Sequence, residues 1–393
     1  MSADSPRALP RLAILPDFPE EQWPSMDLVA EMTASRLSDR HSDIFQVEAL
    51  RPPFRNSFRR LRNIDRLANR FIGYPSFLRK RVRDYDLFHL CDHSYSQLVH
   101  VLPAERTGVF CHDLDTFRCL LEPAQEPRPR WFRAMARRIL TGMQKAAVVF
   151  YTTEAVRRQI EHYGLLDTKR LVKAPLGIAA EFAAASSEPA GVFGTLSEPY
   201  LLHVGSCIPR KRVDVLLDVF AALRKQHPEL RLVQIGGEWT PAQREQIGRL
   251  GFDGNAILQQ RGLSRNDVAA AYRRAAAVLV TSEAEGFGLP VIEAMACGAT
   301  VIASDLPVLR EVGGSVVILC PIGDVPTWAT AVNRILADPS ARPSREQLKA
   351  QADQYSWERF SDIISGAYQN LLGLPESDSH RVAAPRLSSR SVA

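Results

Sequence analysis

Short apolar runs alternate with helix-like stretches along most of this 393-residue chain, and the alternation limits its fold more than any other feature of the sequence. The apolar runs, in chain order, read RLAIL, TGVFCHD, AAVVFYT, YLLHVGS, LRLVQIGG and AAVLVTS. Strands that alternate with helices build βαβ units, in which the strands are parallel. The pattern therefore predicts an α/β protein with parallel sheets.

This order of elements starts twice along the chain. Small and polar residues at 178–199 interrupt it, and a strand, a glycine loop and a helix follow again from Tyr200. A chain of this length also exceeds what one hydrophobic core usually organises. Two such α/β halves form a cleft, with ligands at the carboxyl ends of the strands. We expect a first domain at residues 1–185, a linker at 186–199 and a second domain at 200–354. A disordered polar tail is expected at residues 375–393.

Composition narrows the class of protein. The chain is 46% hydrophobic and 24% charged, as in an ordinary soluble globular protein, and its net charge of +5 does not by itself indicate nucleic acid. No apolar run reaches the length of a membrane span, and the first residues lack the apolar core of a signal peptide. The six cysteines have no paired spacing, which favours reduced thiols and argues against a cysteine metal site. We therefore expect a cytoplasmic protein.

A glycine-rich loop separates two glutamates in the second half. The stretch EAEGFGLPVIEAMACG, residues 283–298, follows an apolar run at 276–282 that is typical of a buried strand. A proline opens the next segment and a glycine follows it, which predicts a helix at about Pro290–Cys297. Glu285 then lies in the loop and Glu293 lies one turn inside the helix.

This arrangement predicts a site for a ligand with both phosphate and sugar hydroxyls. Gly286 and Gly288 let backbone amides come close to a ligand, and a helix N-terminus favours phosphate. Carboxylates accept hydrogen bonds from vicinal hydroxyls, so Glu285 and Glu293 suit a sugar. A nucleotide sugar meets these conditions. The alternative is structural, with one glutamate capping a turn and the other on a solvated helix face.

The segment SEAEGFGLPVIEAMACGATVIASDLPVLREVGG resembles the nucleotide-sugar signature of retaining glycosyltransferases with the GT-B fold, in the group called glycosyltransferase group 1. The similarity extends through much of residues 200–372. It implies two Rossmann-like domains that face each other across a cleft, with the acceptor on the first and the donor on the second. It also implies that Glu285 lies near the transferred sugar and that Glu293 holds the ribose hydroxyls. The backbone that would line the sugar and phosphate site belongs to Gly286, Phe287, Gly288 and Leu289.

Two further parts of the second half fit this resemblance. HVGSCIPRKRVDVLLDVFAAL is similar to the group's glycine turn followed by basic residues, with Gly205 and Ser206 in the turn. Arg210 and Lys211 would neutralise the diphosphate, whose negative charge grows as the glycosidic bond breaks. Many members carry an arginine directly after the glycine, where this chain has Ser206, and this departure bears on Arg210 more than on Lys211. A helix within residues 355–374 is similar to the group's closing helix, which packs back on the first domain.

The sequence does not indicate which base the nucleotide carries. LQQRGLSRNDVAAAYRR resembles the segment whose backbone brackets the base, so the candidates are Arg261, Gly262 and Leu263. Gly236, at the end of a strand, either lets the nucleotide come near or serves only the turn. Uridine, guanosine and adenosine all remain open.

The first half is less regular. GVFCHDLD resembles the group's strand that ends in His-Asp, which makes His112 a candidate contact to the reacting sugar and Asp113 a candidate on the acceptor side. A structural histidine is the alternative. Asp113 and Asp115 are not interpreted as a metal motif, because basic residues and a helix N-terminus can supply the countercharge. No metal and no cofactor are expected, and the nucleotide diphosphate sugar is a donor substrate.

Two other stretches of the first half have open interpretations. LPDFPEEQWPSMDLVAEM stands where the family has a glycine-rich first loop, and a helix is expected from about Asp27. Ser25 and Met26 either line the acceptor pocket or belong to a capped helix start. Residues 51–83 hold ten arginines and one lysine against one aspartate, a net charge of +10, with apolar residues at helical spacing. This segment either lies on an anionic membrane near a lipid-linked acceptor or is a solvated helical excursion, and no nucleic-acid-binding motif accompanies it.

The residues and the resemblance together predict a metal-independent retaining glycosyltransferase. It would move a hexose from a UDP- or GDP-sugar to a glycan or lipid-linked acceptor, in surface polysaccharide or glycoconjugate assembly. The expected location is the cytoplasm, with peripheral contact to the inner face of the membrane left open. The alternatives are a nucleotide-sugar epimerase on the same fold, a glycosidase that uses the two glutamates, and a noncatalytic nucleotide-sugar-binding protein. The basic glycine turn argues against the glycosidase.

Overall fold

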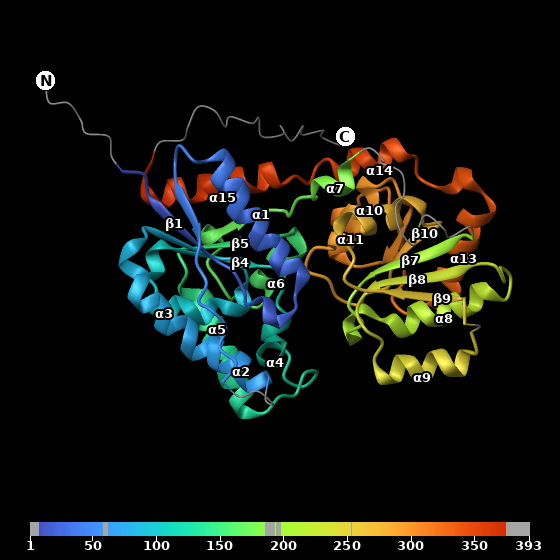
Figure 1. The fold of residues 1–393 in the computed structure, drawn as a ribbon, viewed down its shortest axis with the longest axis horizontal. Helices are drawn as coiled ribbons and strands as arrows, with labels where there is room; N and C mark the ends of the chain where they lie inside the picture. The colour runs from blue at the N-terminus through green and yellow to red at the C-terminus, as the bar shows by residue number, and fades with distance from the viewer. Residues whose placement is uncertain (1–7, 58–61, 185–192, 194–197, 253, 375–393) are drawn as a thin grey trace, which may run out of the picture.

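The computed structural model describes residues 8–57, 62–184, 193, 198–252 and 254–374. Within these residues the chain forms two parallel six-stranded sheets, one in each half (Figure 1). The first has the order β2-β1-β3-β4-β5-β6 and is built from β1 (Arg11–Leu15), β2 (Gln46–Ala49), β3 (Leu87–Leu90), β4 (Thr107–Cys111), β5 (Val148–Tyr151) and β6 (Leu171–Lys173). The second has the order β12-β11-β10-β7-β8-β9 and is built from β7 (Tyr200–Gly205), β8 (Arg231–Gly236), β9 (Ile257–Gln260), β10 (Ala277–Val280), β11 (Val301–Ser304) and β12 (Ile318–Cys320). The predicted α/β class with parallel sheets is confirmed.

Each sheet contains a point where the strand order reverses. In the first sheet β1 lies between β2 and β3, and Leu12 pairs with Leu87 across the reversal. In the second sheet β7 lies between β8 and β10, and Leu202 pairs with Val278. Loops on either side of such a reversal diverge and leave a crevice at the carboxyl ends of the strands, where ligands bind.

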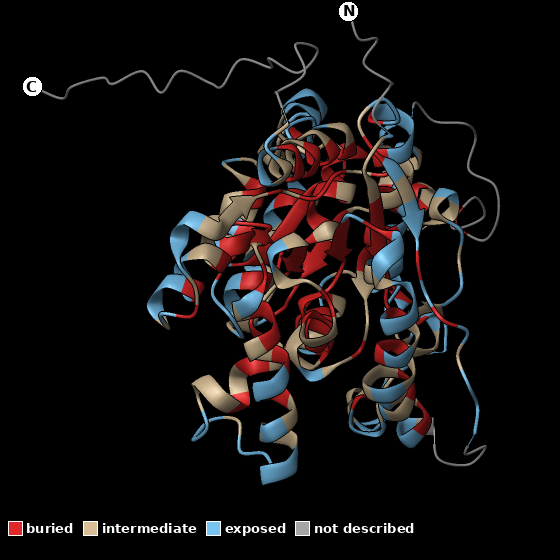
Figure 2. Cartoon of the chain, turned by 90° about the vertical axis from the view of Figure 1, so that its left-hand side faces the viewer, coloured by how far each residue is buried: buried red, intermediate tan, exposed pale blue. Residues whose placement is uncertain are grey.

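Helices cover both sheets, and the inner strands are buried whereas outward helix faces are exposed (Figure 2). The helices of the first half are α1 (Pro24–Arg40), α2 (Arg62–Ala68), α3 (Tyr74–Arg81), α4 (Arg118–Leu121), α5 (Arg130–Lys145), α6 (Glu154–His162) and α7 (Ala180–Ala183). Those of the second are α8 (Val213–Arg224), α9 (Pro241–Leu250), α10 (Arg265–Arg274), α11 (Leu289–Ala296), α12 (Pro307–Gly313), α13 (Val325–Ala337), α14 (Arg345–Ala352) and α15 (Trp357–Leu372). Among the described residues, none of these helices is long and apolar enough to cross a bilayer.

The last helix, α15, lies across the first half beside α1 (Figure 1). Its Tyr368 hydroxyl donates a hydrogen bond to the carbonyl of Phe88 in β3, at 3.1 Å, and fills the space that a Cβ at Gly108 would need. Asp362 contacts Arg40 at the end of α1. Trp357, the first residue of α15, is buried to 1% exposure.

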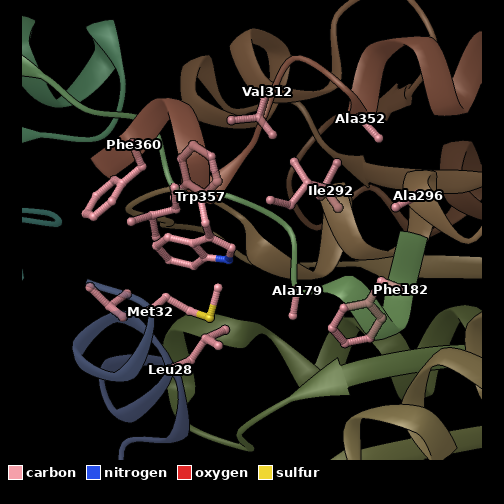
Figure 3. Packing of buried hydrophobic residues seen from close by; sticks show 14 of the residues in the cluster. Leu28, Met32, Ala179, Phe182, Ile292, Ala296, Val312, Ala352, Trp357 and Phe360 are labelled. Carbon is pink, nitrogen blue, oxygen red and sulfur yellow. The ribbon is translucent and has the colours of Figure 1, made fainter. Parts of the chain in front are cut away.

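One hydrophobic cluster joins the two halves. Figure 3 shows Met32 of α1 and Trp357 of α15 beside Phe182 of α7 and Ile292 of α11. A side chain at Gly177 would collide with the backbone at the start of α15, so the two chain crossings between the halves pack directly on each other at this glycine. The halves therefore share a packed apolar junction on the side of α15.

The start of α1 differs from the sequence prediction. The helix begins at Pro24 and not at about Asp27, because proline lacks only an N–H that the first helical position leaves unused. Ser25 and Met26 therefore lie inside its first turn. Ser25 is exposed, whereas Met26 packs on the cluster that joins the halves.

Candidate active site

Loops from both sheets meet at the carboxyl ends of their strands. Thr152, just after β5, donates a hydrogen bond from its hydroxyl to the carbonyl of Gly286, just after β10, at 2.7 Å. A Cβ at Gly286 would stand 2.5 Å from the carbonyl oxygen of His112, just after β4. The sequence predicted that this glycine admits a ligand. In the structure, the backbone of the opposite half lies against this glycine.

Glu285 and Lys211 form a shielded ion pair. Their carboxylate and ammonium groups are 2.6 Å apart, and their side chains are 6% and 13% exposed. The hydroxyl of Ser282 donates a second hydrogen bond to the same carboxylate oxygen, at 2.6 Å. Burial opposes ionisation of Glu285, but the Lys211 charge and these hydrogen bonds outweigh it and hold the pKa of the carboxyl below its ordinary value. Glu285 is therefore a carboxylate at neutral pH.

Glu293 lies in the first turns of α11 with different surroundings. The hydroxyl of Tyr272 in α10 donates a hydrogen bond to its carboxylate, at 3.1 Å. Burial raises the pKa of Glu293 to about 7, although Tyr272 and the charge of Arg265 act in the opposite direction. Two glutamates eight positions apart thus differ in protonation, because only Glu285 has a cation at contact distance.

Arg210 reaches across to the first half. Its guanidinium lies 3.2 Å from the carboxylate of Asp115 and 3.6 Å from that of Asp113. The sequence assigned Arg210 to a diphosphate and did not foresee this pairing. Among the described residues, no group of three or more histidine, cysteine, aspartate or glutamate side chains is placed to hold a metal ion.

His112 is buried and already engaged. Its Nε2 lies 2.8 Å from the carbonyl oxygen of Cys91. Burial lowers the pKa of the imidazole, so the ring is neutral near pH 7. The side chain thus has the structural contact that the sequence left open as an alternative, at the strand end where the sequence placed it.

The glycine loops of the second sheet pack on each other. The amide of Gly237 donates to the carbonyl of Gly205, at 2.9 Å, and a Cβ at Gly236 would stand 2.7 Å from that same oxygen. Ser206, next to Gly205, is half-buried. Gly236 therefore serves this loop contact, which is one of the two roles that the sequence allowed.

The remaining donor candidates lie in three surroundings. Arg261 is exposed and pairs with Glu238 at 3.1 Å, whereas Gly262 has a left-handed backbone with φ +66°. Leu263 is partly buried on the cluster that joins the halves. Phe287 is buried, with its ring edge-on to Tyr355 at 5.5 Å. At the helix start, Gly288 is the left-handed N-cap of α11 and Leu289 is its first residue.

A cavity of about 840 Å³ opens between the halves beside these loops. Asp113, Arg210 and Glu285 line it, together with residues of α4, α6 and the start of α12. Its lining does not include the predicted acceptor residues Ser25 and Met26, nor Glu293. Of the predicted site residues, the cavity therefore brings together Asp113 from the first half with Arg210 and Glu285 from the second.

Several residues of this region were missed by the sequence prediction. Ser282 directly follows an apolar strand, and that position was a usable signal. Tyr272 lies 21 positions before Glu293 on another helix and had no local signal. Asp17 follows β1, and Asp92 and His93 follow β3, where polar residues after apolar runs also marked the strand ends.

The buried carboxyls of Asp17 and Asp92 have opposite pKa shifts. Burial, and then the neighbouring Asp92 charge, raises the pKa of Asp17 well above its ordinary value. Asp92 is also buried, but His93, whose Nδ1 lies 3.1 Å away, holds the pKa of Asp92 far below its usual range. The surroundings therefore favour the protonated form of Asp17 and the ionised form of Asp92.

The arginine-rich segment contains two kinds of arginine. Arg59 and Arg60 lie outside the described residues. Arg51 donates to the carbonyl of Asp17 at 2.8 Å, and Arg66 donates to that of Glu20 at 2.7 Å. Arg70 lies over the Tyr95 ring at 4.3 Å. These three arginines hold the loop between β1 and α1, whereas Arg79, Lys80, Arg81 and Arg83 are exposed.

Two parallel α/β halves with facing strand ends define a protein of the GT-B fold. Solved structures share the fold over nearly the whole chain. A sucrose-phosphate synthase from Thermosynechococcus elongatus aligns with TM-score 0.70 at 17% identity and covers 93% of this chain and 99% of its own. The Anabaena protein HepE in complex with UDP and glucose aligns with TM-score 0.70 at 16% identity, over 92% and 100%.

The sequence comparisons agree with this fold. Residues 193–355 match glycosyl transferases group 1. An O-antigen chain mannosyltransferase B from Escherichia coli is 27% identical over 68% of this chain and 71% of its own length. A serotype-specific mannosyltransferase WbdA from Escherichia coli is 24% identical over 71% of this chain, which spans only 36% of that longer protein.

Proposed function

We propose that this protein transfers a hexose, with retention of anomeric configuration, from a UDP- or GDP-sugar to a glycan or lipid-linked acceptor in surface polysaccharide assembly. The observation that carries the proposal is the pair of glutamates around Gly286 and Gly288, at the strand reversal of the second sheet. Glu285 is ionised beside Lys211, and Glu293 lies one turn inside α11, whose N-terminus follows the glycine loop. Together they offer acceptors for sugar hydroxyls beside cations and a helix N-terminus for phosphate.

In this proposal the chain stabilises the leaving group more than it moves protons. Lys211 and Arg210 lie where the diphosphate would gain negative charge, and preorganised cations stabilise such charge in a shielded site. The diphosphate would compete with Asp113 and Asp115 for Arg210. Glu285 would contact the transferred sugar, and the leaving phosphate would accept the acceptor proton on the same face.

We further propose that Glu293 binds the ribose hydroxyls and that Arg261, Gly262 and Leu263 flank the base. The exposed Arg261 and the open backbone at Gly262 leave room for a ligand at the end of β9. The relatives named as mannosyltransferases favour a mannose donor, whereas the structural neighbour that holds UDP and glucose favours UDP.

Domain boundaries follow the two sheets in this proposal. Residues 1–185 would form the acceptor domain and residues 200–354 the donor domain, joined through 186–199. The helix within 355–374 would return to the acceptor domain. The packing of α15 against α1 and β3 supports this division.

The outer face of residues 51–83 would contact an anionic membrane. Ile64 and Ile72 are 45% and 67% exposed, on α2 and on the turn that follows it, and the exposed cations of α3 come next in the chain. Apolar side chains beside arginines and lysines suit the boundary of an anionic bilayer. The protein would then act at the cytoplasmic face of a membrane. Sedimentation with vesicles of phosphatidylglycerol, compared with phosphatidylcholine, tests this, and equal binding to both would contradict it.

Calorimetric titration with UDP, GDP and ADP, with and without magnesium, tests the function directly. We expect one nucleotide to bind tightly without the metal, and its identity would define the donor class. If none of the three nucleotides binds, the result would contradict the transferase proposal. If the nucleotide sugar is isomerised with no acceptor present, as followed by NMR of the product, the protein is instead an epimerase.

A further inference from the structure

The cavity of about 840 Å³ between the halves extends to one side of the proposed donor site. It starts at Glu285 and Arg210, where the transferred sugar and the diphosphate would meet, and is bounded on the second half by Leu306–Val308 and Ile322. These residues follow β11 and β12, on the opposite side of β10 from β8 and β9. Glu293 and Arg261 are not part of its lining, so the cavity leads away from the proposed nucleoside site.

On the first half, one stripe of α6 faces this cavity. Ala155, Arg158, Gln159 and His162 line it, at the helical spacing i, i+3, i+4 and i+7 that places side chains on one face. Val156 and Ile160 of the same helix are buried in the core of the first half. The amphipathic pattern of α6 therefore directs its planar polar groups into the cavity.

The other charged side chains of the cavity are already paired within the protein. Glu285 pairs with Lys211, Glu283 with Arg212, and Arg210 with Asp113 and Asp115. In the described part of the chain, Arg158 forms neither an ion pair nor a side-chain hydrogen bond, and it is exposed. Its guanidinium is therefore free to bind a ligand without breaking a protein contact.

Volume and chemistry together indicate the occupant. A cavity of this size lies in the upper part of the range of about 300–1,000 Å³ found for small-molecule sites. Guanidinium and amide groups suit ring hydroxyls, and the apolar wall at Leu306, Val308 and Ile322 suits the C–H faces of a pyranose. Tyr163, whose hydroxyl donates to Glu122 at 2.5 Å, adds an aromatic ring at the same end.

We infer that this cavity is the acceptor site and that it binds at least two sugar units of a saccharide chain. The unit that receives the hexose lies at Asp113 and Glu285. The next unit lies on the Arg158, Gln159 and His162 stripe of α6. This inference rests on the proposed function and specifies that the acceptor presents an oligosaccharide to the cleft.

A matched pair of variants tests the inference. Arg158→Ala removes the free guanidinium from the cavity. Arg157→Ala removes the neighbouring arginine of the same helix, which pairs with Glu161 at 2.9 Å outside the cavity. The donor would be the mannose derivative of the nucleotide that calorimetry selects. Transfer would be measured to methyl mannoside, mannobiose and mannotriose, with gluco and galacto series as further acceptors.

We expect oligosaccharides to be better acceptors than methyl glycosides. Arg158→Ala should raise the KM for the best oligosaccharide at least fivefold and leave nucleotide affinity unchanged, whereas Arg157→Ala should change neither. An unchanged KM in Arg158→Ala, an equal effect in both variants, or donor hydrolysis without transfer to any oligosaccharide would overturn the inference. Failure of nucleotide binding in the unmodified protein would instead contradict the proposed function.

Discussion

The two halves contribute to the cleft in different ways. In the second half, the residues proposed to hold the donor sugar and ribose come from one stretch of sixteen positions, 283–298, with Lys211 as a partner. In the first half, Asp17, Asp92 and Asp113 follow three different strands, and His93 lies beside both Asp92 and Asp113. The proposed donor site therefore comes mostly from one local sequence motif, whereas the first-half side of the cleft is formed by strand ends that are far apart in the sequence.

This difference predicts different failures when each side is altered. Substitutions on the donor side should reduce binding or transfer in a folded protein, because the loop residues face an open cleft. Substitutions in the buried carboxyl pair of the first half should reduce stability, because both carboxyls are buried and Asp92 forms an ion pair with His93. The predictions below run from the largest expected effect to the smallest.

Lys211→Ala should have the largest effect on transfer. It removes the cation proposed for the leaving diphosphate, a loss of about 100- to 1,000-fold in kcat. Nucleotide affinity, measured by calorimetry, should fall less than kcat, because the interaction strengthens as the leaving charge develops. Lys225→Ala, an exposed residue after α8, is the control. Equal losses in binding and turnover would mean that Lys211 binds substrate and transition state alike.

Asp92→Asn should lower the free energy of unfolding by about 3 kcal/mol, because it removes the carboxylate nearest to the buried His93, at 3.1 Å, and leaves only Asp113 at 3.7 Å. The effect should depend on pH. Folding lowers the pKa of Asp92, so its stabilisation is present above the ordinary carboxyl pKa and is lost as the pH falls through the lower folded value. Urea unfolding at pH 7 and near pH 3, which is below the ordinary carboxyl pKa of 3.8, would show this. A variant as stable as the parent at pH 7 would contradict the ion pair.

Gly286→Ala should weaken transfer by roughly tenfold, since about 1.4 kcal/mol is a reasonable cost for pushing back the backbone at His112. The prediction separates the two roles of this glycine. If the contact between the halves matters, nucleotide affinity stays near the parent value while turnover falls, and small-angle scattering shows a more open molecule. A fall in nucleotide affinity with unchanged scattering would assign the glycine to the donor alone.

Glu293→Gln should weaken nucleotide binding about tenfold at pH 8, where the parent residue is ionised. At pH 6 the parent carboxyl is largely protonated, so the difference should shrink. Folding raises the pKa of Glu293 from 4.5 to about 7, so the protonated form stabilises the fold fully below 4.5 and this contribution is lost as the pH rises through 7. The variant should therefore be more stable than the parent at pH 8, by roughly 1–2 kcal/mol. Unchanged nucleotide affinity at pH 8 would remove the ribose assignment.

Much of the fold followed from local patterns. The apolar run at 276–282 contains β10, and the helix expected at Pro290–Cys297 is α11, shifted by one residue. The predicted start of α1 was wrong by three residues. The helix begins at Pro24, which the sequence interpretation had assigned to the preceding loop. Such signals work where backbone hydrogen bonds and side-chain periodicity are satisfied within a few positions.

What the sequence determined by itself is the alternation that makes two parallel sheets and the loop that carries Glu285 and Glu293. Both depend on neighbours in the chain: period, glycine, proline and the end of a strand. Only the tertiary structure decided that Tyr272 bonds to Glu293, that Arg210 reaches Asp115 and that Gly286 touches His112. These contacts depend on the distance between groups far apart in sequence. That distance is set by how the two sheets pack through α15 and the apolar cluster of Figure 3.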